Sequence, residues 1–267
     1  MTAKRQEAIT VALVNNKGGV GKTTSAVCLA AGLAMEGHRV LLADLDAQGS
    51  ASLSLGIARA DLQPGAAEVI LEGRLIREAI RPSSVKGLDI LPGSMKLASA
   101  DLALSDVKGR EAVLKTALKP ILADYDIMVL DCPPSLGLLT VNALTAADFF
   151  LVPLTLDYLA LEGLVNLLEA VERIRAGIGK TAAPLGFLLT LADYRLNVTE
   201  EIAGMIRKHY GRLVFKTVIP GNVKLKEAPS FGKTIFDYDA GSAGAEAYRE
   251  LTKEVLHRLG RHDIKTA

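Results

Sequence analysis

The sequence predicts an α/β fold in which a mostly parallel, twisted sheet carries helices on both faces. Two observations lead to this prediction. Short apolar runs rich in Val, Ile and Leu alternate along the chain with segments of helical periodicity, which is typical of strand–helix–strand units around a buried parallel sheet. The 267 residues also contain no internal repeat, low-complexity tract or long linker. They are therefore predicted to form a single domain, with residues 1–8 as a short extension and residues 261–267 as a tail.

Seven of the apolar runs are predicted to be strands: Ile9–Val14, Val40–Ala43, Leu88–Leu91, Ile127–Leu130, Phe149–Val152, Gly186–Thr190 and Val214–Ile219. Five segments are predicted to be helices: Lys22–Met35, Arg110–Leu122, Leu159–Arg175, Val198–His209 and Ala243–Leu259. Glycine is a common helix stop. All but the second of these helices are expected to end at a nearby glycine, in turn Gly37, Gly177, Gly211 and Gly260. No element is assigned between Ile57 and Pro82.

Composition narrows the class of protein. Hydrophobic residues make up 49% of the chain, yet no uncharged apolar run approaches the roughly 18 residues that a membrane-spanning helix needs. The formal net charge is +1, so any contact with nucleic acid has to come from a local patch. The start of the chain lacks the features of a secretory signal, and the two cysteines, Cys28 and Cys132, form no disulfide or zinc framework. A reducing cytoplasm fits these observations.

A glycine-rich turn joins the first predicted strand to the first predicted helix. Residues 14–25 read VNNKGGVGKTTS and end in the Gly-Lys-Thr of a phosphate-binding loop, although Asn16 stands where the first glycine of that pattern belongs. Unpaired N–H groups and the positive end of the helix dipole converge there on one anion. We expect Lys22 to reach the β and γ phosphates and the Thr23 hydroxyl to hold Mg²⁺. The glycines that let the backbone approach the phosphates are Gly18, Gly19 and Gly21.

Two other predicted strands end in carboxylates. Asp131 is followed by Cys-Pro-Pro, which cannot continue a strand; it suits a second magnesium contact, or simply a strand end and helix cap. Asp44 and Asp46 follow the strand that comes after the P-loop helix, and in a right-handed strand–helix–strand unit they lie near the triphosphate. A carboxylate there can orient an attacking water or contact the metal shell, whereas the same sequence also suits a turn and a helix N-cap.

Five motifs occur in a fixed order along the chain: NKGGVGKTT, VLLADLDAQGSAS, DIMVLDCPPSLGLLTVNAL, DYLALEGL and VIPGNVKLKEAPSFGKTI. Together they resemble the ParA/MinD family of deviant Walker ATPases, and the resemblance covers nearly the whole chain. It is greatest to the small Soj-like ParA proteins, which lack an N-terminal winged-helix domain. The resemblance implies a P-loop NTPase fold, ATP and Mg²⁺ as cofactors, and slow ATP hydrolysis that a partner stimulates. It also implies a cytoplasmic, nucleoid-associated protein of a bacterium or archaeon.

The resemblance assigns a role to Lys17, the second lysine of the loop. In the family this signature lysine reaches across a dimer interface to the phosphates of the partner. Two ammonium groups crowding one nucleotide within one subunit would repel each other, whereas a lysine offered in trans adds charge only when two ATP-loaded subunits meet. ATP is then the switch for homodimerisation. Without the motif, Lys17 would be interpreted as an exposed loop lysine.

Other roles follow from the same resemblance. Asp46 matches the family acid that positions the attacking water, and Asp131 matches the acid that supports Mg²⁺ through water. Pro220 lies in a segment that resembles the adenine-contacting loop. The predicted catalytic residues are Lys17, Lys22 and Asp46. The predicted nucleotide-binding residues are Lys17, Gly18, Gly19, Val20, Gly21, Lys22, Thr23, Thr24 and Pro220.

Three basic residues are predicted to contact DNA. Arg195 and Lys224 fall where Soj-like relatives carry basic residues that touch DNA without reading its sequence, which implies salt-sensitive phosphate contacts. The chain departs from the pattern at two positions, because relatives commonly have Arg where it has Gly221 and Lys224. Lys226 is expected to compensate, since an ammonium still neutralises a phosphate. The alternative interpretation of these residues is an ordinary solvated surface.

The resemblance thus predicts a positioning switch. The ATP dimer binds nonspecific DNA, a ParB-like or other cargo-linked protein stimulates hydrolysis, and the released monomer rebinds slowly. The cargo is a chromosome, a plasmid or a protein complex, and the sequence does not choose among them.

The sequence leaves two alternative functions open. A membrane-cycling MinD-like ATPase would use a C-terminal amphipathic helix, and residues 247–259 carry Leu251, Val255, Leu256 and Leu259 on one side. The same pattern suits a helix that covers a sheet edge, and residues 261–267 add no apolar anchor, so a membrane partner is not expected. An iron–sulfur reductase of the same superfamily would bridge two subunits through two cysteines each, but Cys28 is expected to be a core residue.

Overall fold

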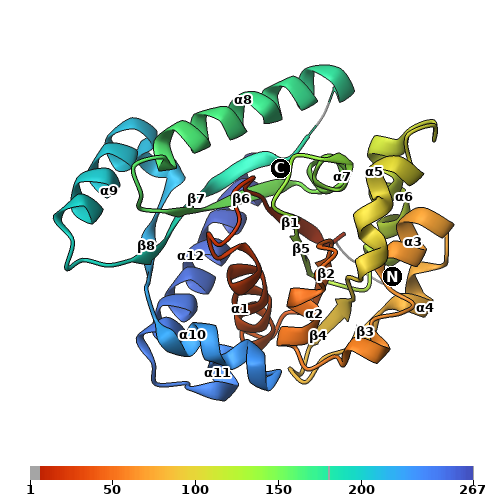
Figure 1. Cartoon of the computed structure of the whole chain (residues 1–267), viewed down its shortest axis with the longest axis horizontal. Helices are drawn as coiled ribbons and strands as arrows, with labels where there is room; N and C mark the ends of the chain where they lie inside the picture. The colour runs from red at the N-terminus through yellow and green to blue at the C-terminus, as the bar shows by residue number, and fades with distance from the viewer. Residues whose placement is uncertain (1–6, 180, 267) are drawn as a thin grey trace.

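The computed structural model describes residues 7–179 and 181–266, which form one eight-stranded sheet with helices on both faces (Figure 1). The strand order is β3-β4-β2-β5-β1-β6-β7-β8. All neighbouring strands are parallel except β3 and β4, which are antiparallel. The strands are β1 Ile9–Leu13, β2 Val40–Asp44, β3 Arg81–Pro82, β4 Leu88–Leu91, β5 Ile127–Asp131, β6 Phe149–Thr155, β7 Ala183–Ala192 and β8 Val214–Pro220. The predicted fold class is confirmed.

The helices differ greatly in length, and four of them exceed ten residues. They are α1 Lys22–Met35, α2 Ser50–Ser54, α3 Ala66–Glu72, α4 Ile76–Ala79, α5 Ala100–Ala103, α6 Val113–Leu118, α7 Leu138–Ala146, α8 Ala160–Ile178, α9 Asn197–Tyr210, α10 Val223–Glu227, α11 Ile235–Tyr238 and α12 Ala243–Thr266. Short 3₁₀ segments lie between several of them.

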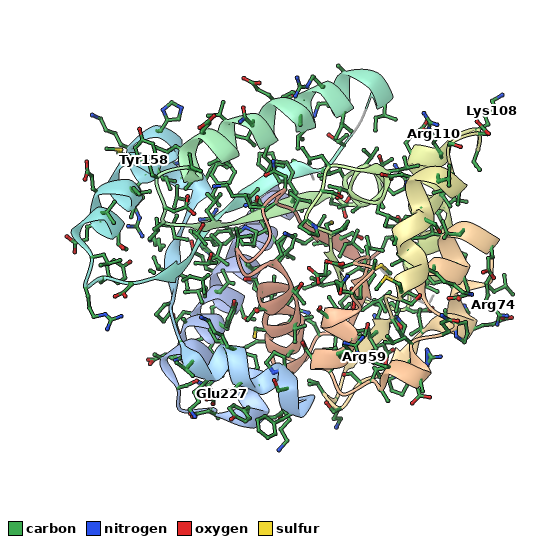
Figure 2. All side chains as sticks on the ribbon, in the orientation of Figure 1. Arg59, Arg74, Lys108, Arg110, Tyr158 and Glu227 are labelled. Atoms are coloured by element: carbon green, nitrogen blue, oxygen red, sulfur yellow. The ribbon has the colours of Figure 1, made fainter. Side chains whose placement is uncertain are left out.

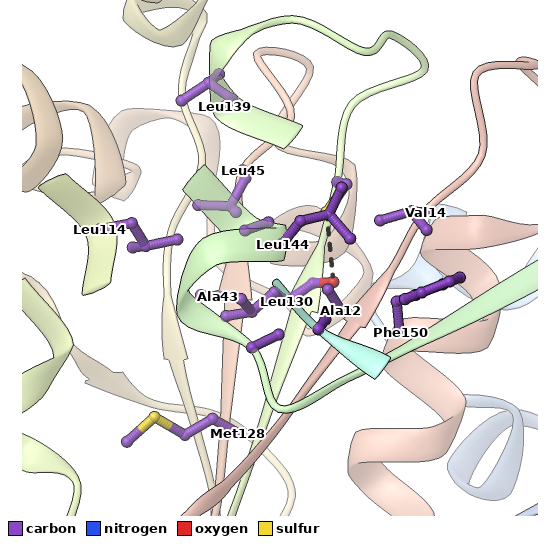
Figure 3. Packing of buried hydrophobic residues seen from close by; sticks show 14 of the residues in the cluster. Ala12, Val14, Ala43, Leu45, Leu114, Met128, Leu130, Leu139, Leu144 and Phe150 are labelled. Carbon is purple, nitrogen blue, oxygen red and sulfur yellow. Dashed lines mark hydrogen bonds between the residues drawn. The ribbon is translucent and has the colours of Figure 1, made fainter. Parts of the chain in front are cut away.

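The sheet separates two hydrophobic clusters. Val11 and Leu13 of β1 pack on one face with α1 and α12. Ala12, which lies between them, points to the other face, where α6, α7 and α8 cover the sheet. Figure 3 shows this second cluster, in which Leu114 and Leu144 approach from the helices. Burial on both faces explains why the central strands β1, β2 and β5 are apolar apart from Thr10 and the terminal residues Asp44 and Asp131.

Several predicted boundaries were wrong. Helix α8 continues through Gly177 to Ile178, and α12 continues through Gly260 to Thr266. Neither glycine has the positive φ that ends a helix, whereas Gly179, which follows α8, has φ 90°. Residues 261–266 of the predicted tail are therefore helical, and residue 267 lies outside the described residues. So do residues 1–6 of the predicted N-terminal extension.

Other elements differ in kind from the prediction. The helix expected over residues 110–122 is α only at Val113–Leu118, with 3₁₀ turns on both sides. Pro120 lies in the second of these turns, and its ring lacks the N–H that a continuing α-helix needs. Helix α7 was not predicted, and residues 57–82, which received no assignment, contain α3, α4 and the whole of the two-residue strand β3.

Helices α1 and α12 are in close contact, and this contact holds α1, the helix that follows the P-loop, in position. The Tyr248 hydroxyl and Ser25 Oγ are hydrogen-bonded at 2.9 Å. A Cβ atom added at Gly32 would lie 2.2 Å from Thr252 Oγ1 and 3.3 Å from Thr252 Cβ. The Thr252 hydroxyl donates to the Tyr248 carbonyl, so this stiff β-branched side chain has little freedom to move away.

Gly32→Ala is therefore expected to destabilise the protein, although alanine is the better helix former. Overpacking of a core costs about 1–3 kcal/mol, and the propensity gain of about 1 kcal/mol does not offset a clash this close. Gly204→Ala in α9 is the control, because a Cβ there meets nothing within 4 Å. Thermal unfolding should show a lower Tm for Gly32→Ala and an equal or higher Tm for Gly204→Ala. Equal gains in both variants would contradict the packing argument.

Candidate nucleotide-binding site

The predicted phosphate loop lies at the carboxyl edge of the sheet, between β1 and α1. Gly19 and Gly21 have φ angles of 75° and 82°, a conformation that side-chain-bearing residues rarely adopt. A Cβ at Gly18 or Gly19 would meet nothing within 4 Å, so one side of the loop is open. The loop therefore presents backbone N–H groups at the N-terminus of α1, as a phosphate cradle requires.

The Lys22 ammonium lies inside this loop. Its side chain is buried, and Nζ donates a 2.8 Å hydrogen bond to the Lys17 carbonyl. Burial lowers the pKa of Lys22, while the nearby carboxylates of Asp131 and Asp46 act in the opposite direction. A buried cation with a single carbonyl partner gains from an anionic ligand, so Lys22 is placed to bind phosphate.

Two residues that sequence reasoning missed, Asn15 in the loop and Thr190 in β7, tie the loop to the neighbouring strands. Asn15 Nδ2 donates to the Pro153 carbonyl at 2.7 Å, and Asn15 Oδ1 accepts from the Lys17 N–H at 2.9 Å. The Thr190 hydroxyl, near the end of β7, contacts the Val20 carbonyl at 2.9 Å. These bonds fix both halves of the loop to β6 and β7.

Asp131 ends β5 next to the loop and is fully buried. Neither of its carboxylate oxygens meets the geometry of a full hydrogen bond among the described residues, although the neighbouring Thr23 hydroxyl acts to lower its pKa. Burial raises the pKa of Asp131 well above its ordinary value, and the charge of Asp44 raises it further. A divalent cation nearby would remove this penalty, and Mg²⁺ usually takes one or two protein carboxylates together with substrate phosphates. Asp131 and the neighbouring Thr23 hydroxyl therefore fit the requirements of a magnesium site.

The two other candidate carboxylates have different surroundings. Asp44 is fully buried, and its carboxylate accepts hydrogen bonds from the backbone N–H groups of Asp46 and Ser52 and from the Ser52 hydroxyl. Burial raises the pKa of Asp44 to about 6, against the effect of these donors. Asp46 is half-buried, and its carboxylate accepts from the Gln48 N–H at 3.0 Å. Asp46 is thus the one of the pair whose carboxylate reaches solvent at the site.

Lys17 points away from its own phosphate cradle. Its Nζ lies 3.4 Å from Asp157 Oδ1, in the loop between β6 and α8. A Cβ at Gly163 would lie 3.3 Å from Lys17 Cε, so the stem of the lysine rests against the first turns of α8. Although burial acts to raise it, hydrogen bonds from Thr155 and Lys17 hold the pKa of Asp157 below its ordinary value. Lys17 is therefore held at the surface, about one-third exposed.

The remaining nucleotide candidates lie further from the cradle. Thr24 is in the first turn of α1 and lines a small cavity with Cys28 and Leu225. Pro220 ends β8 and pairs with Ala192 at the end of β7. It shares the carboxyl edge of the sheet with the P-loop, but β6 and β7 separate its strand from β1.

Two of the three predicted DNA contacts are already paired with carboxylates of their own chain. Arg195 binds Asp193, with Nη2 2.6 Å from Oδ2, and Lys224 Nζ lies 2.9 Å from Glu227 Oε2. Lys226 is exposed and has no ion-pair partner in the part of the chain that the structure describes. The structure thus leaves Lys226 as the free cation of the set.

Both cysteines are buried, at the P-loop helix and directly after β5. Burial raises the pKa of Cys28 to about 12 and also raises that of Cys132. Thiols in this state are unreactive, and neither lies on a surface where a second chain could share a cluster. Within residues 7–179 and 181–266, no helix has the length and apolar character to cross a membrane.

Known proteins are similar to this chain in sequence and in structure. Residues 8–182 match a family model described as an AAA domain. The chain is 44% identical over 245 residues to the sporulation initiation inhibitor protein Soj of Bacillus subtilis, covering 92% of this chain and 97% of that protein. It is 45% identical over 249 residues to the chromosome-partitioning ATPase Soj of Thermus thermophilus, covering 93% and 96%.

A solved structure is similar over almost the same extent. The cobyrinic acid a,c-diamide synthase of Mycobacterium smegmatis, with a bound ATP analogue and magnesium, superimposes with a TM-score of 0.82 at 34% identity. The match covers 95% of this chain and 96% of that one.

Proposed function

Because the chain belongs to the ParA/MinD family of ATPases and is of the Soj type, we propose that it is an ATP-dependent dimerising switch that binds DNA without sequence preference. The protein is an ATPase of the chromosome-partitioning class, and ATP and Mg²⁺ are its cofactors. The proposal adds the dimer, the DNA and the movement of a cargo, which is a chromosome, a plasmid or a protein complex. A ParB-like or other cargo-linked protein would stimulate hydrolysis.

The roles that we propose for the site residues follow from their positions around the phosphate loop. Lys22 and the glycine-rich loop bind the phosphates, and Thr23 and Asp131 would hold Mg²⁺, which when bound would neutralise negative charge on the phosphates. Asp46 reaches solvent beside this cradle and orients the attacking water. Lys22 is the one lysine among these groups. Lys17 does not add a second positive charge to the phosphates of its own chain, because its side chain lies against Asp157.

The position of Lys17 is the observation that carries the proposal. A lysine held at the surface beside the phosphate loop can serve the nucleotide of a second copy that approaches this face. Exposed apolar side chains at the ends of β6 and β7, the strands that hold the phosphate loop, support such a contact. They are Tyr158 and Leu159 after β6, and Leu191, Tyr194, Leu196 and Val198 at and after the end of β7. Figure 2 shows Tyr158 standing out from the ribbon near α8 and α9.

Lys226→Ala is expected to weaken DNA binding of the ATP form more than Arg195→Ala does. Lys226 offers an unpaired charge, whereas Arg195 and Lys224 must first leave Asp193 and Glu227. Gel shifts with ATP over a salt series should show the slope of log affinity against log salt fall by about 0.9 for each lost phosphate contact. Lys108→Ala is the control, because Lys108 lies at the opposite end of the molecule from Glu227 (Figure 2). ATP dimers without affinity for DNA at low salt would refute the DNA step.

The membrane-cycling alternative loses its main support in the structure. Leu251, Val255 and Leu259 of α12 are buried in the cluster that α12 forms with α1 and the sheet. An interfacial helix needs its apolar face free for lipid. The apolar side of residues 247–259 is therefore already in use within the fold.

A further inference from the structure

We propose that Ser52 is a positioning residue for ATP hydrolysis, which acts by holding the turn that carries Asp46. The inference rests on the role proposed above for Asp46 as the residue that orients the attacking water. Ser52 lies in α2, six residues beyond Asp46, and it is fully buried.

The Ser52 hydroxyl joins two segments that flank the Asp46 turn. It donates to Asp44 Oδ2 at 2.8 Å and accepts from the Gly93 N–H, in the turn after β4, at 3.1 Å. The backbone N–H of Ser52 also donates to Asp44 Oδ2, at 2.9 Å. The other oxygen of Asp44 accepts from the Asp46 N–H at 3.2 Å. A continuous chain of hydrogen bonds therefore runs from Gly93 through Ser52 and Asp44 to the backbone of Asp46.

The turn has little room to shift within this network. A Cβ at Gly93 would lie 2.7 Å from the Asp46 carbonyl and 2.8 Å from Asp44 Cγ. A Cβ at Gly49, on the other side of the turn, would lie 2.8 Å from the Gly93 carbonyl. The backbone of Asp46 is thus held between the Gly93 turn and the Asp44 carboxylate, and Ser52 connects the two.

This arrangement separates the roles of the two aspartates. The Asp44 carboxylate accepts from three donors, one on Asp46 and two on Ser52 of α2, so it fixes geometry, while the Asp46 carboxylate remains available at the site. Removal of the Ser52 hydroxyl would take one donor from Asp44 and leave the buried Gly93 N–H unpaired. A displacement of about 1 Å in a group that orients a reactant lowers a rate by about 10²-fold.

The test compares Ser52→Ala with Ser54→Ala. Ser54 is a buried serine of the same helix, and among the described residues its hydroxyl bonds to the Ser50 carbonyl alone, at 2.7 Å. For Ser52→Ala we expect kcat for ATP to fall about 10- to 100-fold with KM for ATP unchanged, and labelled ATP to be retained uncleaved for longer. Ser54→Ala should behave as the unaltered protein. Unchanged kcat in Ser52→Ala, or a rise in KM without a fall in kcat, would overturn the proposal.

Two further variants keep the result interpretable. Asp44→Asn keeps the side-chain shape but replaces one acceptor oxygen with an amide nitrogen, so the side chain can no longer accept from both Ser52 and the Asp46 N–H, and it should show a similar fall in kcat. If both Ser52→Ala and Asp44→Asn lose ATP binding, the pair is structural and the proposal is wrong. Asp46→Ala, measured in parallel, separates the role of Asp46 from that of Ser52. Normal turnover in Asp46→Ala refutes the role of Asp46 itself, whereas loss of turnover there with normal Ser52→Ala refutes only the role of Ser52.

Discussion

Lys17→Ala is expected to reduce ATP hydrolysis by about 10³-fold or more, the effect typical of removing a cation supplied in trans to a phosphoryl-transfer site. ATP binding should largely survive. The loop glycines, Lys22 and the supports from Asn15 and Thr190 do not depend on the Lys17 side chain. Steady-state hydrolysis and equilibrium binding of a fluorescent ATP analogue measure the two quantities separately. An unchanged hydrolysis rate would count against any role of Lys17 at the phosphates.

Asp157→Asn is the matched control for this variant. If Lys17 served only to pair with Asp157 at 3.4 Å, then Asp157→Asn would reproduce the loss seen in Lys17→Ala. If Lys17 works on the nucleotide of a second copy, release from Asp157 leaves turnover intact or raises it. A surface ion pair of this kind contributes at most about 1 kcal/mol to stability, so unfolding would not confuse the comparison.

Asp46→Ala is expected to block hydrolysis by at least about 10²-fold for a different reason, and with the opposite effect on assembly. Without the carboxylate that orients water, bound ATP persists, and the ATP-loaded dimer should accumulate instead of disappearing. Size-exclusion chromatography with ATP and Mg²⁺ should therefore show more dimer for Asp46→Ala than for the unaltered protein.

Asp61→Ala removes an exposed carboxylate that lies beyond this turn, and it should leave both the rate and the assembly unchanged. Rapid hydrolysis by Asp46→Ala would show that another group orients the water. Loss of ATP binding in Asp46→Ala would instead indicate that Asp46 supports the phosphate loop itself.

The parts of the site that the sequence predicted share one property, which is that local context defines them. Lys22 and the glycines follow a strand and open a helix, and Asp131 ends a strand, so their positions follow from the order of elements. The ion pairs of Arg195 with Asp193 and of Lys224 with Glu227 were not predicted, although each carboxylate stands only two or three residues away.

The parts that were missed depend on contacts between distant segments. Asn15 bonds to a carbonyl 138 residues away, and Thr190 contacts one 170 residues away. The bond from Ser52 to Gly93 depends on β2 and β4 being neighbours in the sheet. Spacing along the chain carries no signal for such contacts, since strand order has to be known first. The predicted helix stops at Gly177 and Gly260 were wrong because neither glycine adopts the positive φ of a helix stop, and α8 ends instead before Gly179, whose φ is 90°.

The central claim is that each chain offers Lys17 to the nucleotide of the other chain. Mixing the Lys17→Ala and Asp46→Ala proteins tests this claim most directly. Each variant alone is expected to be inactive. In a mixed dimer, however, the Lys17→Ala chain keeps its own Asp46 and receives an intact Lys17 from the Asp46→Ala chain, so one complete site forms. The account predicts that combining the two proteins before ATP is added restores part of the hydrolysis. A mixture that binds ATP but remains as inactive as its components would contradict it.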